Sequence, residues 1–564
     1  MSLIDLASMV LAPTAVKDGK VYNAIPNDQD FTFSRGTEAT RVNSAGLIEK
    51  ARTNLLLQSN TFDTTWTTSN ASVTGGQSGY DGSSDAWLLE STSTAFSLYQ
   101  NYTQSGVSTF SIFAKKGTSA SFGIDIFTSV STNAQFFNLS NGTLDYSTGS
   151  VVSADIIDKG NGWYHCIVTT NNTGTIYYAR ITNGVGNTYI QSAQLEQGLV
   201  STDVITTTTT SVTVGITDDL PRVDYSGGGC PSLLLEGSRT NINTQSEYFG
   251  SSSWNKARMS ITDNAVTSPE GVQNGANFVE DSTSNSHPLY DTFTVSSGTS
   301  YTVSMFVKKG SRDYFRFNAA TSSAITFFNL ADGTVHSGTG GIEDFGNGWY
   351  RCSMTFTAAS TSEEIYIEPS INGSSANYQG DGSVSMSIYG FQLEAGSYPT
   401  SYIPSYGTST SRSADSCSLT NASNLFNNDT AVWLIDIERM GIDYTDIGDS
   451  LTLKDGSNVR QITLWFDAPL HRIRFRDGKN SFTTIGSSGG VIETPAGERK
   501  KIALKIDGTT LKVFADGVQK GSNYTRPTAF DFTKMDMTGI GYKIKNVQFY
   551  TTALTDAQVI ELTK

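Results

Sequence analysis

Along most of the chain, apolar and polar residues alternate at every second position, which is the period of a β-strand that buries one face. The alternation is clearest over residues 110–114, 301–305 and 502–506. Asn161-Gly162 and Asn347-Gly348 supply the left-handed backbone that a two-residue hairpin turn requires. The pattern therefore predicts short antiparallel strands that are joined by tight turns.

The last part of the chain continues this pattern and ends on a helical signal. Asp507-Gly508 joins two alternating segments and predicts a hairpin. Thr555 and Gln558 have the spacing of a capping box, in which a hydroxyl and an amide satisfy the first backbone amides of a helix. Helices are otherwise expected to be scarce, so we predict one short helix that runs through Leu562.

Five short tracts occur twice, in the same order, about 190 residues apart. The first set comprises residues 52–54, 114–117, 136–139, 160–164 and 194–196, and the second set comprises residues 239–241, 307–310, 327–330, 346–350 and 392–394. This period is longer than that of solenoid repeats and close to the size of a whole domain. The repeat therefore predicts two tandem homologous domains.

The 564 residues are too many for a single core. We predict an all-β protein with three tandem antiparallel β-sandwich domains of the jelly-roll type and a short C-terminal helix. The predicted parts are an N-terminal lead-in over residues 1–40, a first sandwich over 41–215, a second sandwich over 221–415 and a different third domain over 420–564. The start of the lead-in is expected either to pack on the first domain as a strand or short helix, or to attach the chain to another protein.

The overall charge restricts the partners. The formal net charge is −15 and the isoelectric point is near 4.8, so the chain repels the phosphate backbone of nucleic acids and anionic membrane surfaces. No segment has the roughly 20 apolar residues that cross a bilayer. We therefore expect a soluble protein with no nucleic-acid partner and no membrane insertion.

Four cysteines are too few for a disulfide scaffold, and they lack metal-ligand spacing. Cys166 and Cys352 occupy the same place in the two copies, so we expect buried free thiols there. Cys230 and Cys417 lie near the two ends of the second copy. A bridge between them, formed outside a reducing cytosol, is the alternative to two free thiols.

The sequence does not indicate catalytic chemistry. None of the four histidines stands in a metal-ligand pair, beside a nucleophile motif or in a phosphate-binding loop. Both copies share one glutamate, Glu196 in the first and Glu394 in the second, and we expect these residues to hold a turn. A structural calcium site is the alternative, because hard cations bind carboxylate oxygens. No other cofactor and no enzyme activity are predicted.

Sugar binding requires an aromatic platform for the apolar face of a sugar ring and polar side chains for its hydroxyls. Trp66 and Trp254 recur in the two copies, as do Trp163 and Trp349, so core packing explains them. Residues that differ between the copies are the better candidates. The predicted carbohydrate-binding residues are Tyr80, Asp81 and Trp87 in the first copy, Arg312, Asp313 and Tyr314 in the second copy, and Trp465 in the third domain. Ordinary packing is the alternative for Trp87.

Two sets of segments resemble a phage protein family. Residues 221–225 and 230–236, followed by 239–241, resemble a module common in tail-fibre and other appendage proteins of tailed bacteriophages. Residues 2–7 and 40–49 are similar to the N-terminal start of such proteins. The module looks like the carbohydrate-binding β-sandwiches that are attached to glycan-degrading enzymes. The first copy departs from it, because Lys50-Ala51 stands where the second copy has Leu-Leu-Glu-Gly.

The third domain has a resemblance of its own. Residues 420–564 resemble the laminin-G and concanavalin-like lectin group, through 502–504, 514–517 and 544–550. Together the resemblances imply a virion appendage, a tail or head fibre, that adheres to glycans on the bacterial surface. They imply contact with other virion proteins through the N-terminal segment, and we expect a homo-oligomer, with a trimer as the working hypothesis. The alternatives are a virion decoration protein without glycan contact and a surface-polysaccharide depolymerase.

Overall fold

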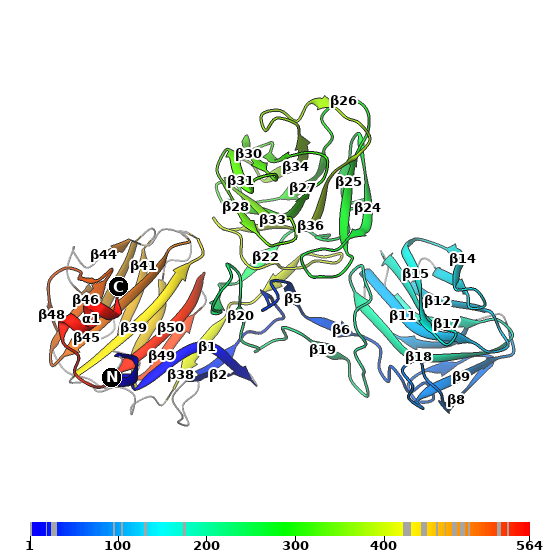
Figure 1. Cartoon of the computed structure of the whole chain (residues 1–564), viewed down its shortest axis with the longest axis horizontal. Helices are drawn as coiled ribbons and strands as arrows, with labels where there is room; N and C mark the ends of the chain where they lie inside the picture. The colour runs from blue at the N-terminus through cyan, green and yellow to red at the C-terminus, as the bar shows by residue number, and fades with distance from the viewer. Residues whose placement is uncertain are drawn as a thin grey trace.

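The computed structural model shows a chain that is folded almost entirely as antiparallel β-strands in three lobes (Figure 1). The described residues are 3–17, 20–23, 31–93, 96–102, 105–128, 132–172, 176–420, 430–441, 448–457, 461–467, 470–476, 482–485, 491–493, 497–526, 532–538 and 541–564. The all-β prediction is confirmed, and the described helices are a 3-10 helix at Leu3–Leu6 and α1 at Asp556–Leu562. In the described part of the chain, no helix is long and apolar enough to cross a membrane.

The first sandwich consists of two six-stranded sheets. One sheet has the order β14 (Thr143–Thr148), β13 (Thr132–Asn138), β12 (Ser121–Thr128), β17 (Ile176–Asn183), β10 (Phe96–Asn101), β7 (Thr67–Thr68). The other has the order β15 (Val151–Gly160), β16 (Trp163–Asn172), β11 (Gly106–Lys116), β18 (Gly186–Gln197), β9 (Ala86–Ser91), β8 (Ala71–Gln77). Because Phe110 and Ile112 of β11 share one buried core with Ile124 and Ile126 of β12, the sheets pack face to face.

The second sandwich repeats this architecture strand for strand. One sheet has the order β23 (Asn255–Lys256), β27 (Leu289–Thr294), β34 (Ser362–Ser370), β29 (Tyr314–Ala319), β30 (Ala324–Asn329), β31 (Thr334–Ser337). The other has the order β24 (Met259–Val266), β25 (Gly275–Glu280), β36 (Val384–Ala395), β28 (Ser300–Lys309), β33 (Trp349–Thr357), β32 (Gly340–Asp344). A short ribbon of β26 (Ser284–Asn285) and β35 (Tyr378–Gln379) is added to it. The matched tracts of the sequence therefore form the same fold twice.

The C-terminal lobe combines the end of the chain with strands from two earlier regions. Its strands from the start of the chain and of the second copy are β1 (Met9–Lys17), β2 (Lys20–Asn23), β3 (Phe31–Ser34), β20 (Val223–Asp224) and β21 (Ser232–Leu235). Its remaining strands are β38 (Ser416–Leu419), β39 (Thr430–Arg439), β40 (Gly448–Asp455), β41 (Gln461–Asp467), β42 (Leu470–Arg476), β43 (Phe482–Thr484), β44 (Val491–Glu493), β45 (Arg499–Asp507), β46 (Thr510–Ala515), β47 (Val518–Gln519), β48 (Tyr524–Thr525), β49 (Phe532–Thr538) and β50 (Tyr542–Tyr550). The predicted capping box is present at α1, where the Thr555 hydroxyl accepts from the Gln558 amide.

The expected packing of the N-terminal segment on the first domain is wrong. Strand β1 pairs with β50, with Met9 opposite Phe549 and Leu11 opposite Val547, and both marked ends of the chain lie in the C-terminal lobe (Figure 1). Met9 and Leu11 are buried in the core of that lobe. The physical reason is that an unpaired edge of a sheet accepts another strand. Strand β21 pairs with β50 in the same way, so residues at the start of the predicted second domain also belong to this lobe.

Three two-stranded ribbons connect the lobes. They are β4 (Thr40–Val42) with β5 (Ile48–Lys50), β6 (Arg52–Asn54) with β19 (Val212–Val214), and β22 (Arg239–Asn241) with β37 (Thr410–Arg412). Each of the last two ribbons pairs the start of one copy with its end. The chain therefore enters and leaves each sandwich at one place, near the centre of the molecule (Figure 1).

The buried residues support the expectations for tryptophan and cysteine. Trp66, Trp163, Trp254 and Trp349 are all at most 5% exposed. Cys166 and Cys352 are buried free thiols, and burial raises the pKa of each far above its usual value. The alternative of a bridge between the other two cysteines is wrong, because one is exposed, the other lies in the C-terminal core, and both are free.

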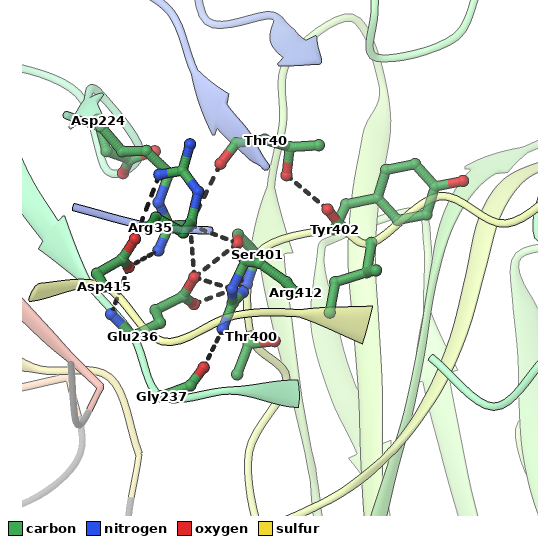
Figure 2. Close-up of polar contacts among 12 residues, drawn as sticks. Arg35, Thr40, Asp224, Glu236, Gly237, Thr400, Ser401, Tyr402, Arg412 and Asp415 are labelled. Atoms are coloured by element: carbon green, nitrogen blue, oxygen red, sulfur yellow. Dashed lines mark hydrogen bonds and ion pairs between the residues drawn. The ribbon is translucent and has the colours of Figure 1, made fainter. Parts of the chain in front are cut away.

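A buried ion cluster joins segments that are far apart in the sequence (Figure 2). Glu236 accepts from Arg222 at 2.6 Å and from Arg412 at 2.7 Å. Asp415 forms ion pairs with Arg222 and Arg35. These five side chains are at most 1% exposed. Burial alone would raise the pKa of Glu236, but the two guanidinium groups bring it far below its usual range. The lead-in and both ends of the second copy are therefore held together by charge.

A second buried cluster joins the first copy to the second sandwich. The Lys50 ammonium lies 2.6 Å from Glu247 and 2.7 Å from Glu270, and Arg52 pairs with Glu270 at 2.9 Å. Lys50 belongs to the segment in which the first copy departs from the module. The residue that distinguishes the first copy here is therefore a cation that contacts two carboxylates of the second sandwich.

Candidate functional site

The two aromatic residues predicted in the first copy, Trp87 and Tyr80, pack their rings against other residues of the sandwich. The Trp87 indole packs over the backbone of Gly75, meets Phe62 edge to face at 6.1 Å, and donates to the Asn60 carbonyl at 3.0 Å. The ring of Tyr80 stacks on Phe113 at 3.7 Å. Both rings are therefore occupied by contacts within the sandwich.

Asp81 lies in the loop between β8 and β9 and holds that loop closed. Its carboxylate accepts from the Ser83 amide at 3.1 Å and from the Gln191 side chain at 3.3 Å. Hydrogen bonds from Ser83 lower the pKa of Asp81 below its usual value. The structure thus separates Asp81, which faces solvent, from the rings of Tyr80 and Trp87.

In the second copy, Arg312 turns away from solvent. Its guanidinium donates to the buried Glu280 at 3.1 Å, pairs with Asp381 at 2.9 Å, and lies 5.0 Å from the centre of the Tyr378 ring. Burial would raise the pKa of Glu280, but its hydrogen bond from Arg312, with others, lowers it. The charge of Arg312 is therefore neutralised within the sandwich.

The two residues after Arg312 remain closer to the surface. Asp313 pairs with Lys309 at 2.5 Å, and both side chains are more than 40% exposed. Tyr314 begins β29 and meets His336 edge to face at 5.0 Å. The predicted group of charge, hydroxyl and ring is thus not brought to one point. The side chain of Trp465, on β41, lies outside the described residues.

The two shared glutamates hold equivalent turns. Glu196 accepts from Gln194 at 2.7 Å and from the Thr202 amide at 2.9 Å. Glu394 accepts from the equivalent Gln392 at 2.6 Å and from the Thr400 amide at 2.8 Å. Within the described ranges, no group of three or more His, Cys, Asp or Glu side chains is placed to hold a metal ion.

The structure brings together a different set of residues, on the outer face of one sheet in each sandwich. We call these the first and second tyrosine faces. Leu98 and Leu289 point into the cores, so their neighbours Tyr99 and Tyr290 point outward, because successive side chains of a strand alternate. The first tyrosine face comprises Tyr99, Asp125, Phe127, Phe136, Tyr146, Tyr178 and Arg180, and the second comprises Tyr290, Arg316, Phe327, Glu364, Tyr366 and Glu368.

The first tyrosine face combines stacked rings with one ion pair. Arg180 donates to Asp125 at 2.7 Å, and its guanidinium lies 4.6 Å from the centre of the Phe127 ring. Burial raises the pKa of Asp125 to about 6, although Arg180 opposes the rise. Tyr146 stacks on Phe136 with ring centres 4.4 Å apart and is 53% exposed. Tyr146 therefore presents an open aromatic platform.

The second tyrosine face has the same elements in another arrangement. Tyr290 and Tyr366 stack in parallel at 4.7 Å. The Tyr366 hydroxyl donates to Glu364 at 2.9 Å, and burial with this acceptor raises the pKa of Tyr366 to about 12. Arg316 pairs with Glu368 at 2.7 Å and lies 5.5 Å from the centre of the Phe327 ring.

The two tyrosine faces share one position by strand register. Leu98 lies opposite Ile181, and Leu289 lies opposite Ile367. Each leucine directly precedes a tyrosine, Tyr99 or Tyr290. Tyr99 and Tyr290 therefore occupy the same outward position. The sequence carries a signal for this position, because the dipeptide Leu-Tyr occurs in both copies at the usual offset. Rings with adjacent carboxylates and guanidinium groups offer stacking for the apolar face of a sugar and charged partners for its hydroxyls.

No protein-family model matches the chain, and no curated protein sequence matches it. Solved structures with some likeness include domain 4 of the extracellular arabinanase AbnA from Geobacillus stearothermophilus in complex with arabinotriose, with 18% identity, a TM-score of 0.22, and coverage of 27% of this chain and 73% of that one. The tandem CBM22 domains of Xyn10C from Paenibacillus barcinonensis show 11% identity and a TM-score of 0.21, over 61% and 97%. The LG1-3 region of the laminin α2 chain shows 10% identity and a TM-score of 0.16, over 82% and 96%.

Proposed function

We propose that this chain is an adhesion protein that binds glycan chains through its two tyrosine faces, without turnover of the glycan. The observation that carries the proposal is the recurrence of outward aromatic residues beside a guanidinium–carboxylate pair on the same sheet of both sandwiches. Core packing does not require these side chains, because they lie on the solvent side of their sheets. Open faces of this kind suit internal segments of a long glycan.

The resemblance to phage appendages supports a virion location for this adhesion. We propose a tail or head fibre protein that is assembled in the host cytoplasm and presents both sandwiches to bacterial surface glycans. Since β1 and β3 are part of the C-terminal lobe, attachment to other virion proteins is proposed at that lobe rather than through a separate arm.

Two faces in one chain suit weak individual contacts. Once one face is bound, the second contact is intramolecular, and avidity rises without new contacts. The buried ion clusters fix the segments that connect the lobes, so the faces are held at a set spacing. A trimer, as proposed for the fibre, would present three such pairs.

A glycan array that includes host surface polysaccharides tests the proposal. We expect binding by the wild-type protein, loss of most of the signal in the double variant Tyr146→Ala/Tyr366→Ala, and no change in Val518→Ala, an exposed control in the C-terminal lobe. Equal binding by the double variant would refute the role of the tyrosine faces. Release of reducing ends from host polysaccharide would instead favour a depolymerase. Failure of the protein to compete with virions for host cells would favour a decoration protein.

A further inference from the structure

A cleft of about 270 Å³ lies between the second sandwich and the C-terminal lobe. Its walls come from β4 and the loop after β20, from the outer face of the β28, β33 and β32 sheet, and from β39 and β50. Figure 1 shows β20 between these two lobes. Its lining includes Phe306, Glu343, Phe345, Arg351, Glu438 and Lys543. The cleft is distinct from both tyrosine faces, which lie on the other sheet of each sandwich.

The cleft contains a charged cross-strand pair that the first copy lacks. Glu343 lies opposite Arg351 in the second sandwich. By strand register, the equivalent pair in the first sandwich is Ile157 opposite His165. The second copy thus has two charged residues where the first copy has one apolar and one weakly basic residue. Because both copies have the same fold, the fold does not require the charged pair.

The first copy also fills the equivalent place. Phe113 lies opposite His165, as Phe306 lies opposite Arg351. In the first sandwich, Tyr80 stacks on Phe113 at 3.7 Å and Phe113 stacks on His165 at 4.4 Å. In the second sandwich, the Arg351 guanidinium lies over the Phe306 ring instead, 5.4 Å from its centre, and Phe306 is 1% exposed.

The polar groups of the cleft have hydrogen-bonding capacity that the protein does not use. Arg351 donates from one terminal nitrogen to Ser304 at 3.1 Å and to the Thr400 carbonyl at 2.7 Å. Its Nε is buried and has no partner among the described residues. The Glu343 side chain is exposed and makes no hydrogen bond or ion pair with any described residue. An unpaired donor and an unpaired acceptor thus lie on neighbouring strands.

Aromatic rings form the apolar side of the cleft. Phe306 meets Phe345 edge to face at 4.9 Å and Tyr402 edge to face at 6.0 Å. Glu438 lies 3.5 Å from Lys543 on the side of the C-terminal lobe. The cleft therefore has an apolar side and a polar side of mixed charge, which suits a neutral molecule with one apolar face and several hydroxyls.

We infer that this cleft binds a single neutral sugar unit, with Arg351 donating to and Glu343 accepting from its hydroxyls and the Phe345 ring against its apolar face. Pockets for drug-sized ligands run from about 300 to 1,000 Å³, so the cleft holds a smaller molecule, of the size of one sugar ring. The cleft is recessed between the two lobes and open to solvent on one side, so it takes one ring at the end of a glycan chain, whereas the tyrosine faces bind along the chain. The inference rests on the proposed function and assigns the terminal unit of the glycan to a separate site.

The test uses variants that install the residues of the first copy. Glu343→Ile and Arg351→His are made in the full chain, and Ile157→Glu in the first sandwich is the matched control. Binding of the methyl glycosides of glucose, galactose, mannose and N-acetylglucosamine is measured by saturation-transfer NMR and calorimetry. We expect wild-type protein to bind at least one of them, Glu343→Ile to bind it at least tenfold more weakly, and Ile157→Glu to bind it as wild type does.

The outcomes separate this inference from the proposed function. Glu343→Ile should leave the array signal for long glycans within twofold, because the tyrosine faces are intact. If wild-type protein binds none of the four glycosides, or if Glu343→Ile binds them as wild type does, the inference is overturned while the array result still decides the proposed function. Lower thermal stability of Glu343→Ile with unchanged glycoside binding would show that the pair serves only the contact between lobes.

Discussion

Removal of the Glu236 carboxylate should loosen the centre of the molecule. In Glu236→Ala, Arg412 loses its ionic partner and Arg222 keeps only Asp415. The Ser401 amide and hydroxyl, which donate to Glu236 at 2.7 and 2.6 Å, lose their acceptor as well. Removal of one partner from a buried ion pair costs about 3 to 5 kcal/mol, since a desolvated charge is left behind.

The loss should appear at the junction rather than in the sandwich cores. We expect Glu236→Ala to be cleaved by protease at the connecting ribbons, with a larger radius of gyration in solution scattering, while both sandwich cores resist cleavage. The matched control is Glu49→Ala, which breaks the partly exposed pair with Arg41 and should cost about 0 to 1 kcal/mol. If Glu236→Ala is cleaved no faster than Glu49→Ala, the buried cluster does not hold the lobes together.

Four further outcomes are expected. Burial raises the pKa of Asp125 from 3.8 to about 6, so between these pH values the folded state keeps a proton that the unfolded chain has released. The free energy of unfolding should therefore fall by up to about 3 kcal/mol as pH rises from about 4 to 6. Thermal unfolding of Asp125→Asn across this range should lack that fall. Burial lowers the pKa of His165 to about 4, so its contribution to stability rises with pH between about 4 and 6.5, and its ring should show no NMR titration above pH 5. Thr555→Ala removes the cap of α1 and should cost about 1 kcal/mol, seen as faster amide exchange in α1 alone. Light scattering of the full chain should give a trimer mass, and a single-chain mass at micromolar concentration would contradict the proposed fibre.

Local pattern predicted most of the strands because alternation and turn residues act between near neighbours. The hairpin at Asp507-Gly508, the capping box at Thr555 and the doubled sandwich are all present. The pairing of β1 with β50 was not predictable in this way. It joins residues at opposite ends of the sequence, and alternation shows that a strand has a buried face without showing which sheet receives it.

The candidate site was harder to predict for a related reason. Differences between the copies directed attention to Trp87 and Arg312, and the structure shows both engaged within their sandwiches. Tyr99 and Tyr290 agree between the copies and point outward, so a search for differences between the copies does not select them. A shared residue reports the fold only if it is buried, and burial depends on strand register rather than on composition.

The most direct measurement is an experimental structure of the full chain with the oligosaccharide that gives the strongest array signal. We predict sugar rings against Tyr146 and Phe136 in the first sandwich, and beside Tyr290 and Tyr366 in the second, with hydroxyls bonded to the neighbouring charged groups. An oligosaccharide bound elsewhere on the molecule, with both tyrosine faces empty, would contradict the proposed function.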